Sequence, residues 1–363
     1  MNDALLEKVI ALVRDYRKNN DPKMKWMWGE ALLGYAMLLL DEYLETDESL
    51  PFLTEYCEYY LKNRPKVDHA DRLAPILITY LTDRISHTNR FQELTAEGID
   101  YILNEPRILE DAVNHLGRSF AGKFYPKSIW VDSLVMFALF PALYGRLESD
   151  EKMLEIARKQ PLIYRKYLFD SASGLWYHAY WVKSRQAYPK KNLYWGRGNG
   201  WVLFALPSIL DYLGDFPEKE EIIEVFQKTA AAVCKTQNEN GMFKTLLLQP
   251  SYEETSGTAL IAAGLINGVN HGYLDKKFLE PGIKAFAAVA SKIQSKNGRI
   301  ILPGISGPTI PLPVFPKLGY KLIPRGDNWS YGIAALIFAA LAYAQIGKEK
   351  RIPWLINGGV ISE

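Results

Sequence analysis

Apolar residues recur every three or four positions along most of the chain, which is the pattern of amphipathic α-helices. Near the N-terminus, one such face is formed by Leu5, Leu6, Val9, Ile10 and Val13. The same periodicity predicts about twelve helices joined mostly by short loops. After the first, the predicted helices begin near Gly29, Glu48 and Asp71 or cover residues 90–103, 127–146, 150–169, 198–213, 217–237, 254–270, 275–295 and 330–346. Strand patterns are weak, and only residues 174–183 and 241–248 are predicted as hairpin arms.

The predicted helices alternate in composition. Segments such as GEALLGYAMLLL (29–40) and TSGTALIAAGLI (255–266) are rich in small residues, whereas EKEEIIEVFQKTAAAV (218–233) carries a single apolar stripe. A helix that is apolar on most sides is buried, and one with a single stripe is peripheral. We therefore predict an all-α protein, an (α/α)6 barrel of six helical hairpins forming one domain over residues 1–363. An open solenoid is the alternative, but we find no repeat of fixed length.

Chemically distinctive residues precede or open the predicted inner helices. Trp28 precedes the first, Asp71 opens the second, and Trp130 and Asp132 lie in the first turns of the third. The fourth opens with WGRGNGW (195–201), and Glu254 opens the fifth. In a closed ring whose inner helices run the same way, these N-termini meet at one end. The sequence therefore predicts a cleft there, lined with tryptophans, carboxylates and an arginine.

The motif WGRGNGW combines three groups suited to an acidic sugar. Its glycines allow close approach of the backbone to a ligand. Trp195 and Trp201 offer flat apolar faces, and Arg197 offers a planar fork that matches a carboxylate. Asn199 lies in the same motif and is predicted to bind substrate with them. The alternative is a glycine-rich helix start with core tryptophans and a surface arginine.

Charge and composition exclude some classes of function. The chain has 363 residues with 43 Lys and Arg against 41 Asp and Glu, a net charge of +2. This balance gives no electrostatic footprint for nucleic acid or a membrane surface. The charged N-terminal segment is not a signal peptide, and we interpret Cys57 and Cys234 as free thiols. We predict a cytoplasmic protein, a monomer or homodimer, in which residues 301–322 form a lid or a dimer contact.

Three segments resemble those of one enzyme family. WGRGNGW, YPKSIWVDSLVMF (125–137) and SYEETSGTA (251–259) are similar to motifs of the unsaturated rhamnogalacturonyl hydrolases, glycoside hydrolase family 105. That family is related to the unsaturated glucuronyl hydrolases of family 88. The resemblance implies an (α/α)6 barrel that removes a 4,5-unsaturated uronic acid from the non-reducing end of oligosaccharides made by polysaccharide lyases. The implied partner is therefore an unsaturated acidic oligosaccharide.

The resemblance also implies roles for individual residues. Asp132 matches the catalytic aspartate, and Asp71 matches a second aspartate of the site. The residues implied or predicted to contact substrate are Trp28, Trp130, His178, Trp195, Arg197, Asn199, Trp201 and Glu254. His115 is the nearest candidate for a family histidine that precedes the catalytic aspartate, although the gap is longer here. No metal or cofactor is predicted, because the histidines lack the spacing of metal ligands.

The implied chemistry differs from that of ordinary glycosidases, which use two carboxylates at the anomeric centre. An acid protonates C4 of the unsaturated sugar, water adds at C5, and the hemiketal opens and expels the remaining chain. We expect Asp132 to act as acid and then as base. Its aromatic neighbour Trp130 raises its pKa and Arg197 lowers it, so we expect Asp132 to be protonated mainly in the substrate complex.

Two other functions remain open from the sequence. An inverting glycosidase on the same barrel needs a second carboxylate with space for water, which Asp71 would supply. A helical carbohydrate-binding protein without activity is the non-enzymatic alternative. A sugar epimerase is disfavoured, because it would need paired histidines on inner helices. His69 is expected to be a surface residue at a helix start.

Overall fold

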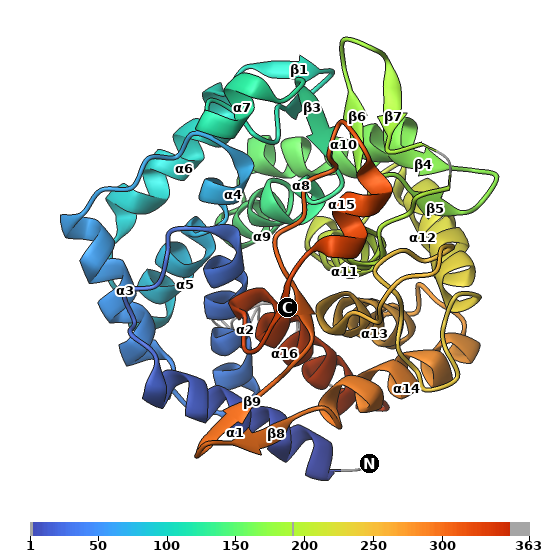
Figure 1. The fold of residues 1–363 in the computed structure, drawn as a ribbon. Helices are drawn as coiled ribbons and strands as arrows, with labels where there is room; N and C mark the ends of the chain where they lie inside the picture. The colour runs from blue at the N-terminus through green and yellow to red at the C-terminus, as the bar shows by residue number, and fades with distance from the viewer. Residues whose placement is uncertain (1–2, 191, 349–363) are drawn as a thin grey trace.

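In the computed structural model, which describes residues 3–190 and 192–348, twelve long helices form two concentric rings (Figure 1). The outer ring consists of α1 (Asp3–Asn19), α3 (Leu50–Lys62), α6 (Gln92–Asn104), α10 (Glu151–Leu168), α12 (Lys219–Cys234) and α14 (Leu279–Ala290). The inner ring consists of α2 (Trp28–Leu44), α5 (Ile76–Ser86), α9 (Leu139–Glu148), α11 (Gly196–Leu213), α13 (Thr255–Asn270) and α16 (Ser330–Ala344). Outer and inner helices alternate along the chain, and α16 packs against α2 to close the ring. The predicted (α/α)6 barrel is confirmed.

The inner helices are buried on nearly all sides, as their composition predicts. Every residue of α16 is buried, and its sequence SYGIAALIFAALAYA allows this because it contains no charged side chain. Small residues let these helices approach each other closely. A Cβ atom on Gly264 of α13 would lie 2.3 Å from the backbone oxygen of Leu203 in α11, so no other residue fits this contact without a backbone shift.

The second and third inner helices are interrupted near their N-termini. A short helix α4 (Ala70–Leu73) precedes α5, and Pro75 caps the longer helix that follows. In the third, α8 (Ser133–Met136) precedes α9. These breaks separate α4 and α8 from the long helices, and Asp71 lies in α4 while Asp132 immediately precedes α8.

The prediction of a helix from residue 127 was wrong at its start. Ser128–Trp130 form strand β3, which pairs with β6 (Ala179–Trp181), and β6 pairs in turn with β7 (Gln186–Tyr188). Strand partners far along the chain decide this, and local periodicity does not record them. The strand predicted within 174–183 is confirmed as β5 (Leu175–Trp176) and β6, whereas residues 241–248 form only isolated bridges.

One excursion of the chain crosses the end of the barrel where the inner helices begin. Strands β10 (Ile305–Ser306) and β11 (Arg325–Gly326) pair at its base, and helix α15 (Pro316–Leu322) lies within it. We call residues 307–324 the cap segment (Figure 1). Two tyrosines outside it hold its far part. Tyr125 donates to the backbone oxygen of Pro311 and Tyr188 to that of Leu312, both at 2.7 Å.

The remaining elements are short. They are β1 (Arg107–Leu109), β2 (Ala112–Val113), α7 (Phe120–Phe124), β4 (Phe169–Asp170), the 3-10 turn η1 (Lys276–Phe278), β8 (Gln294–Lys296) and β9 (Arg299–Ile301). Within the two described ranges, none of the helices is both long enough and apolar enough to cross a bilayer. The predicted single domain extends to residue 363, and its last part, 349–363, lies outside the described residues.

Candidate active site

Two aspartates and two histidines meet under the cap segment. Asp71 lies in the first turn of α4, and Asp132 immediately precedes α8. His115 Nε2 lies 3.5 Å from Asp71 Oδ1, and His178 Nε2 lies 3.3 Å from Asp132 Oδ2. The carboxylate side chains are 18% and 14% exposed, whereas the histidines are buried. Both predicted aspartates and both predicted histidines therefore form one cluster whose carboxylates reach the surface.

Each histidine is fixed by a hydroxyl and by a tryptophan. His115 Nδ1 lies 2.8 Å from Ser133 Oγ, and its ring stacks on Trp130 at 4.5 Å. His178 Nδ1 lies 2.8 Å from the Tyr320 hydroxyl of α15, and its ring stacks on Trp195 at 4.2 Å. Since Nε2 of His178 faces a carboxylate, it carries the proton, and Nδ1 accepts from Tyr320.

The two carboxyl groups have opposite pKa shifts. Burial and the nearby charge of Asp132 raise the pKa of Asp71 to about 8. Burial also favours the neutral form of Asp132, but the N–H of His178 outweighs it and holds the pKa of Asp132 below its usual value. Divergent pKa values in neighbouring acids are the arrangement that acid–base chemistry uses. The directions of the two shifts favour a proton on Asp71 and a charge on Asp132.

Burial lowers the pKa of both histidines. The pKa of His115 falls to about 3, so this ring is neutral beside Asp71. The pKa of His178 is also lowered, although Asp132 partly offsets the effect of burial. Arg197 was expected to lower the pKa of Asp132. In the structure that effect comes from His178 and His115, and Asp71 is the carboxyl whose pKa is raised.

Arg197 holds the base of the cap segment. Its side chain is buried, and its two terminal nitrogens donate to the backbone oxygens of Ser306 and Gly307, both at 2.8 Å. A further bond of 3.1 Å goes to the Thr309 hydroxyl. The predicted fork toward a substrate carboxylate is therefore occupied by the protein itself. Only the buried Nε atom of Arg197 has no partner among the described residues.

The side chains of Asn199 and Glu254 are also hydrogen-bonded to backbone groups of the protein. The Asn199 amide donates to the backbone oxygens of Trp176 and Trp195 at 3.1 and 3.0 Å and accepts from the Trp176 N–H at 2.9 Å. Glu254 caps α13 through the N–H groups of Ser256 and Gly257, and it also accepts from the N–H of Ser306. These contacts give both residues positioning roles, because a fully buried polar group takes the nearest backbone partners, and their predicted contacts with substrate stay predictions.

The tryptophans divide into two groups. Trp130 and Trp195 support the histidines, as described above. Trp28 meets Trp201 edge to face at 5.9 Å and lies 4.5 Å from the ring of Tyr331. Trp28 is the partly exposed member, whereas Trp201 is buried. Trp28 therefore fits the predicted aromatic position of a cleft, and Trp201 forms the wall behind it.

Three buried N–H groups of the WGRGNGW motif have no partner among the described residues. They are Trp195 Nε1, Trp201 Nε1 and Arg197 Nε. Native proteins leave few buried polar atoms unsatisfied, so each requires an explanation. Donors without acceptors suit an acceptor-rich ligand such as a uronic acid.

Sequence reasoning missed two residues of the site. Tyr320 lies in a predicted lid but gave no signal of contact with His178, 142 positions away. His69 was expected at the surface, and this expectation was wrong. Its side chain is buried, and its Nδ1 atom lies 2.7 Å from Asp68 Oδ1. An adjacent Asp-His pair at a helix start was the available signal for His69.

Replacing Tyr320 with phenylalanine tests how the His178 tautomer controls Asp132. Without the hydroxyl, Nδ1 of His178 has no donor, and the proton can move there from Nε2. Asp132 then loses the N–H that stabilises its charge, so its pKa rises. We expect Tyr320→Phe to lower kcat roughly 10–100-fold and to move the acidic limb of the kcat–pH profile to higher pH. An unshifted acidic limb with a normal melting temperature would contradict this role.

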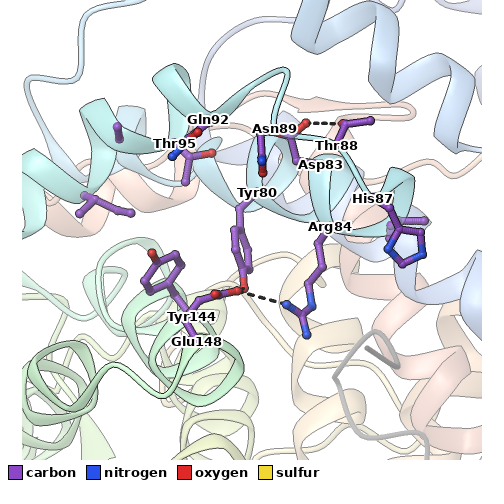
Figure 2. Close-up of a pocket in the computed structure, with 13 residues that line it drawn as sticks. Tyr80, Asp83, Arg84, His87, Thr88, Asn89, Gln92, Thr95, Tyr144 and Glu148 are labelled. Atoms are coloured by element: carbon purple, nitrogen blue, oxygen red, sulfur yellow. Dashed lines mark hydrogen bonds and ion pairs between the residues drawn. The ribbon is translucent and has the colours of Figure 1, made fainter. Parts of the chain in front are cut away.

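A cavity of about 670 Å³ (Figure 2) lies away from this cluster, where inner helices end rather than begin. It lies among the C-terminal ends of α5 and α9 and the start of α6. Its charged groups are engaged with each other, because Glu148 accepts from both Tyr80 and Arg84 and Asp83 accepts from the N–H of Phe91. Its described lining includes no residue of the predicted site. The carboxylate pair under the cap segment is therefore the candidate active site.

A double helical ring with paired carboxylates and tryptophans at one end defines a class, the helical-barrel glycoside hydrolases. Comparison with known proteins gives the family. Residues 6–346 match the model of Glycosyl Hydrolase Family 88, and the chain belongs to that family. Similar solved structures show the same fold. A possible family 105 member from Salmonella enterica superposes with a TM-score of 0.82 at 23% identity, covering 95% of this chain and 93% of that one.

Two curated relatives and a further solved structure are named as hydrolases of unsaturated sugars. The unsaturated rhamnogalacturonyl hydrolase YesR of Bacillus subtilis is 27% identical over 349 residues, 92% of this chain and 94% of its own. An unsaturated 3S-rhamnoglycuronyl hydrolase of Alteromonas sp. is 30% identical over 257 residues, 68% of this chain and 59% of its own. The unsaturated glucuronyl hydrolase of Bacillus sp. GL1 has a TM-score of 0.76 at 15% identity, over 99% of this chain and all of its own.

Proposed function

We propose that the protein removes a 4,5-unsaturated uronic acid from the non-reducing end of oligosaccharides that polysaccharide lyases have produced. The observation that carries this proposal is the cluster in which His115 faces Asp71 and His178 faces Asp132, with the pKa of Asp71 raised and that of Asp132 lowered. Family membership supports it, as do the activities named for the curated relatives. A pectic, rhamnogalacturonan-type substrate is favoured, because the relative matched over most of both chains is named for it.

The reaction needs one proton delivered to carbon and one removed from water. Protonation of C4 of the vinyl ether leaves an oxocarbenium character at C5, and water adds there. The hemiketal that results opens to a ketone, and the bond to the remaining sugar chain breaks as its oxygen takes a proton. Asp132 delivers the first proton and, once ionised, takes one from the attacking water.

In the free protein the proton is stored next to its point of use. Asp71 holds it up to about pH 8, while Asp132 is ionised against His178. An anionic uronyl group entering the cluster disfavours the charge on Asp132 and raises its pKa. The proton then moves from Asp71 to Asp132, and the pair titrates as one unit. Asp71 is therefore the reservoir, and Asp132 is the group that reacts.

Recognition of the uronic carboxylate falls to the unpartnered donors. Trp195 Nε1, Trp201 Nε1 and Arg197 Nε are buried without partners among the described residues. Each of these atoms carries an N–H that can donate a hydrogen bond, and an ionised carboxylate can only accept hydrogen bonds. The N-terminus of α11, which begins at Gly196, adds the positive end of a helix dipole at the same place. Trp28 offers the face on which the sugar ring stacks.

An ultraviolet assay on lyase digests tests the proposed function. Hydration destroys the conjugated double bond, so absorbance falls as substrate is consumed. Separate digests of rhamnogalacturonan, homogalacturonan and chondroitin identify the substrate class, and we expect the rhamnogalacturonan digest to respond. Release of reducing sugar from saturated oligosaccharides would instead support an inverting glycosidase. Binding of a digest without any change in absorbance would support a carbohydrate-binding protein.

A further inference from the structure

A groove of about 650 Å³ runs beside the cap segment and is assigned to no part of the reaction above. One wall is the start of α15, with Phe315, Lys317 and Lys321. The other comes from the end of β7 and the loop after it, with Tyr188, Lys190 and Leu193. Two segments more than 100 positions apart therefore form a single open channel.

The charge of this groove has one sign. Lys190, Lys317 and Lys321 line it, and no Asp or Glu is among the described residues that do. Lys317 makes one polar contact, 3.0 Å from its Nζ atom to Gln249 Oε1, and Lys190 and Lys317 are exposed. A groove with three cations and no anion attracts negatively charged ligands and raises their local concentration.

Apart from Gln249, the rest of the lining is largely apolar. Phe315 is 75% exposed and Leu318 is 53% exposed, while Tyr188 and Leu193 form the opposite side. Large apolar side chains at the surface of a monomeric protein mark an interaction site when they gather in one place. Apolar faces between dispersed cations suit a chain of acidic sugars, whose ring faces are apolar and whose carboxylates are spaced along the chain.

The residues that line the groove are close in sequence to residues of the candidate active site. Lys321 follows Tyr320, whose hydroxyl contacts His178, and Lys317 lies less than one helical turn, about 5.4 Å, away. Leu193 stands two positions before Trp195, on which His178 stacks. Tyr188 stacks on Trp181 at 4.0 Å in the sheet that carries Trp130. The groove and the candidate active site therefore lie on neighbouring residues of the same two segments.

We propose that this groove binds the part of an acidic oligosaccharide that lies beyond the sugar next to the cleaved bond. This inference rests on the proposed function and names its preferred substrates, which are acidic chains of four or more sugars. A disaccharide occupies only the carboxylate cluster and gains nothing from the groove. The lysines then lower KM for longer chains and leave kcat unchanged, because they contact parts of the substrate that do not react.

Chain length and salt separate the groove from the catalytic cluster. Unsaturated oligosaccharides of two, four and six sugars are purified from the digest that wild type consumes. The variant Lys190→Gln/Lys317→Gln/Lys321→Gln is compared with a matched variant, Lys219→Gln/Lys276→Gln/Lys277→Gln, which removes the same charge at the other end of the barrel. We expect the groove variant to raise KM about tenfold for four and six sugars and to leave the disaccharide unchanged. We also expect it to lose the salt dependence that wild type shows with long chains.

Several results would overturn the groove and leave the proposed function intact. These are equal KM values for all chain lengths in wild type, or equal effects of the two triple variants. A change of oligomeric state in the groove variant, measured by analytical ultracentrifugation, would assign the groove to a second copy of the chain. Binding of saturated tetragalacturonate, measured by calorimetry, tests the groove without turnover. Tetragalacturonate binding that the groove variant abolishes, with no turnover of any digest, would refute the proposed function alone.

Discussion

Replacing Asp132 with asparagine is expected to abolish turnover while leaving the fold intact. Asparagine keeps the shape of the side chain and the contact with His178, but it neither donates a proton to C4 nor accepts one from water. Because one residue serves both steps, the loss in kcat should reach roughly 10³–10⁴-fold, the upper range for general acid–base catalysis. The absorbance assay with the responding digest measures this loss, and the melting temperature shows whether the variant is folded.

A similar pair elsewhere in the barrel supplies the control for Asp132. Asp211, near the end of α11, faces His271 at 2.8 Å at the other end of the inner ring. The substitution Asp211→Asn removes a carboxylate from a histidine in the same way, without touching the cluster under the cap segment. We expect normal turnover in this variant. Equal losses in Asp132→Asn and Asp211→Asn would mean that the first effect is structural and would refute the role of Asp132.

The fold was predictable because its signal repeats along the chain. Inner helices are apolar on all sides and outer helices have one stripe, so the alternation of burial is visible in local composition. The end at which the site lies was also predictable, because the distinctive residues recur at the N-termini of inner helices. The strand β3 at Ser128–Trp130 was not, since its partner β6 lies about fifty positions away and local propensity does not encode that pairing.

The sequence identified which residues form the site, but it did not show the partners or the pKa shift of each one. Motif and resemblance identified Asp71, Asp132, His115 and His178, and these four lie together in the structure. They did not show that Arg197 is taken up by backbone oxygens of the cap segment, because a side chain's partners depend on packing between distant segments. For the same reason the sequence did not show that the pKa of Asp71 is raised, and protonation of Asp132 in the substrate complex stays a prediction. Burial depends on the folded environment of each carboxyl, and at Asp71 no hydrogen bond offsets it as that of His178 does at Asp132.

Removal of the carboxyl of Asp71 is expected to cost about 10²-fold in kcat and to change the pH profile. In wild type the pair loses its stored proton as Asp71 ionises, so activity should fall above about pH 8. In Asp71→Asn no proton is stored, and Asp132 must be protonated from solvent. The residual activity should therefore decline with rising pH well before pH 8, because the pKa of Asp132 is low.

The substitution Asp71→Asn should increase the stability of the folded protein, although it lowers kcat. The folded protein keeps the proton on Asp71 up to about pH 8, whereas the unfolded chain releases it near its ordinary value of 3.8. Between these values the unfolded state binds fewer protons, so wild type loses stability as the pH rises. Asparagine has no proton to lose. The melting temperature of Asp71→Asn relative to wild type should therefore rise between about pH 4 and 8 and then remain constant.

These two measurements distinguish a proton reservoir from a residue that only binds sugar. A binding residue with an ordinary pKa would raise KM, leave the alkaline limb near pH 8 in place and produce no pH-dependent gain in melting temperature. A reservoir lowers kcat, removes that limb and produces the gain, because all three follow from one carboxyl held neutral by burial. If the alkaline limb persists in Asp71→Asn, another group carries it, and the proton is not stored on Asp71.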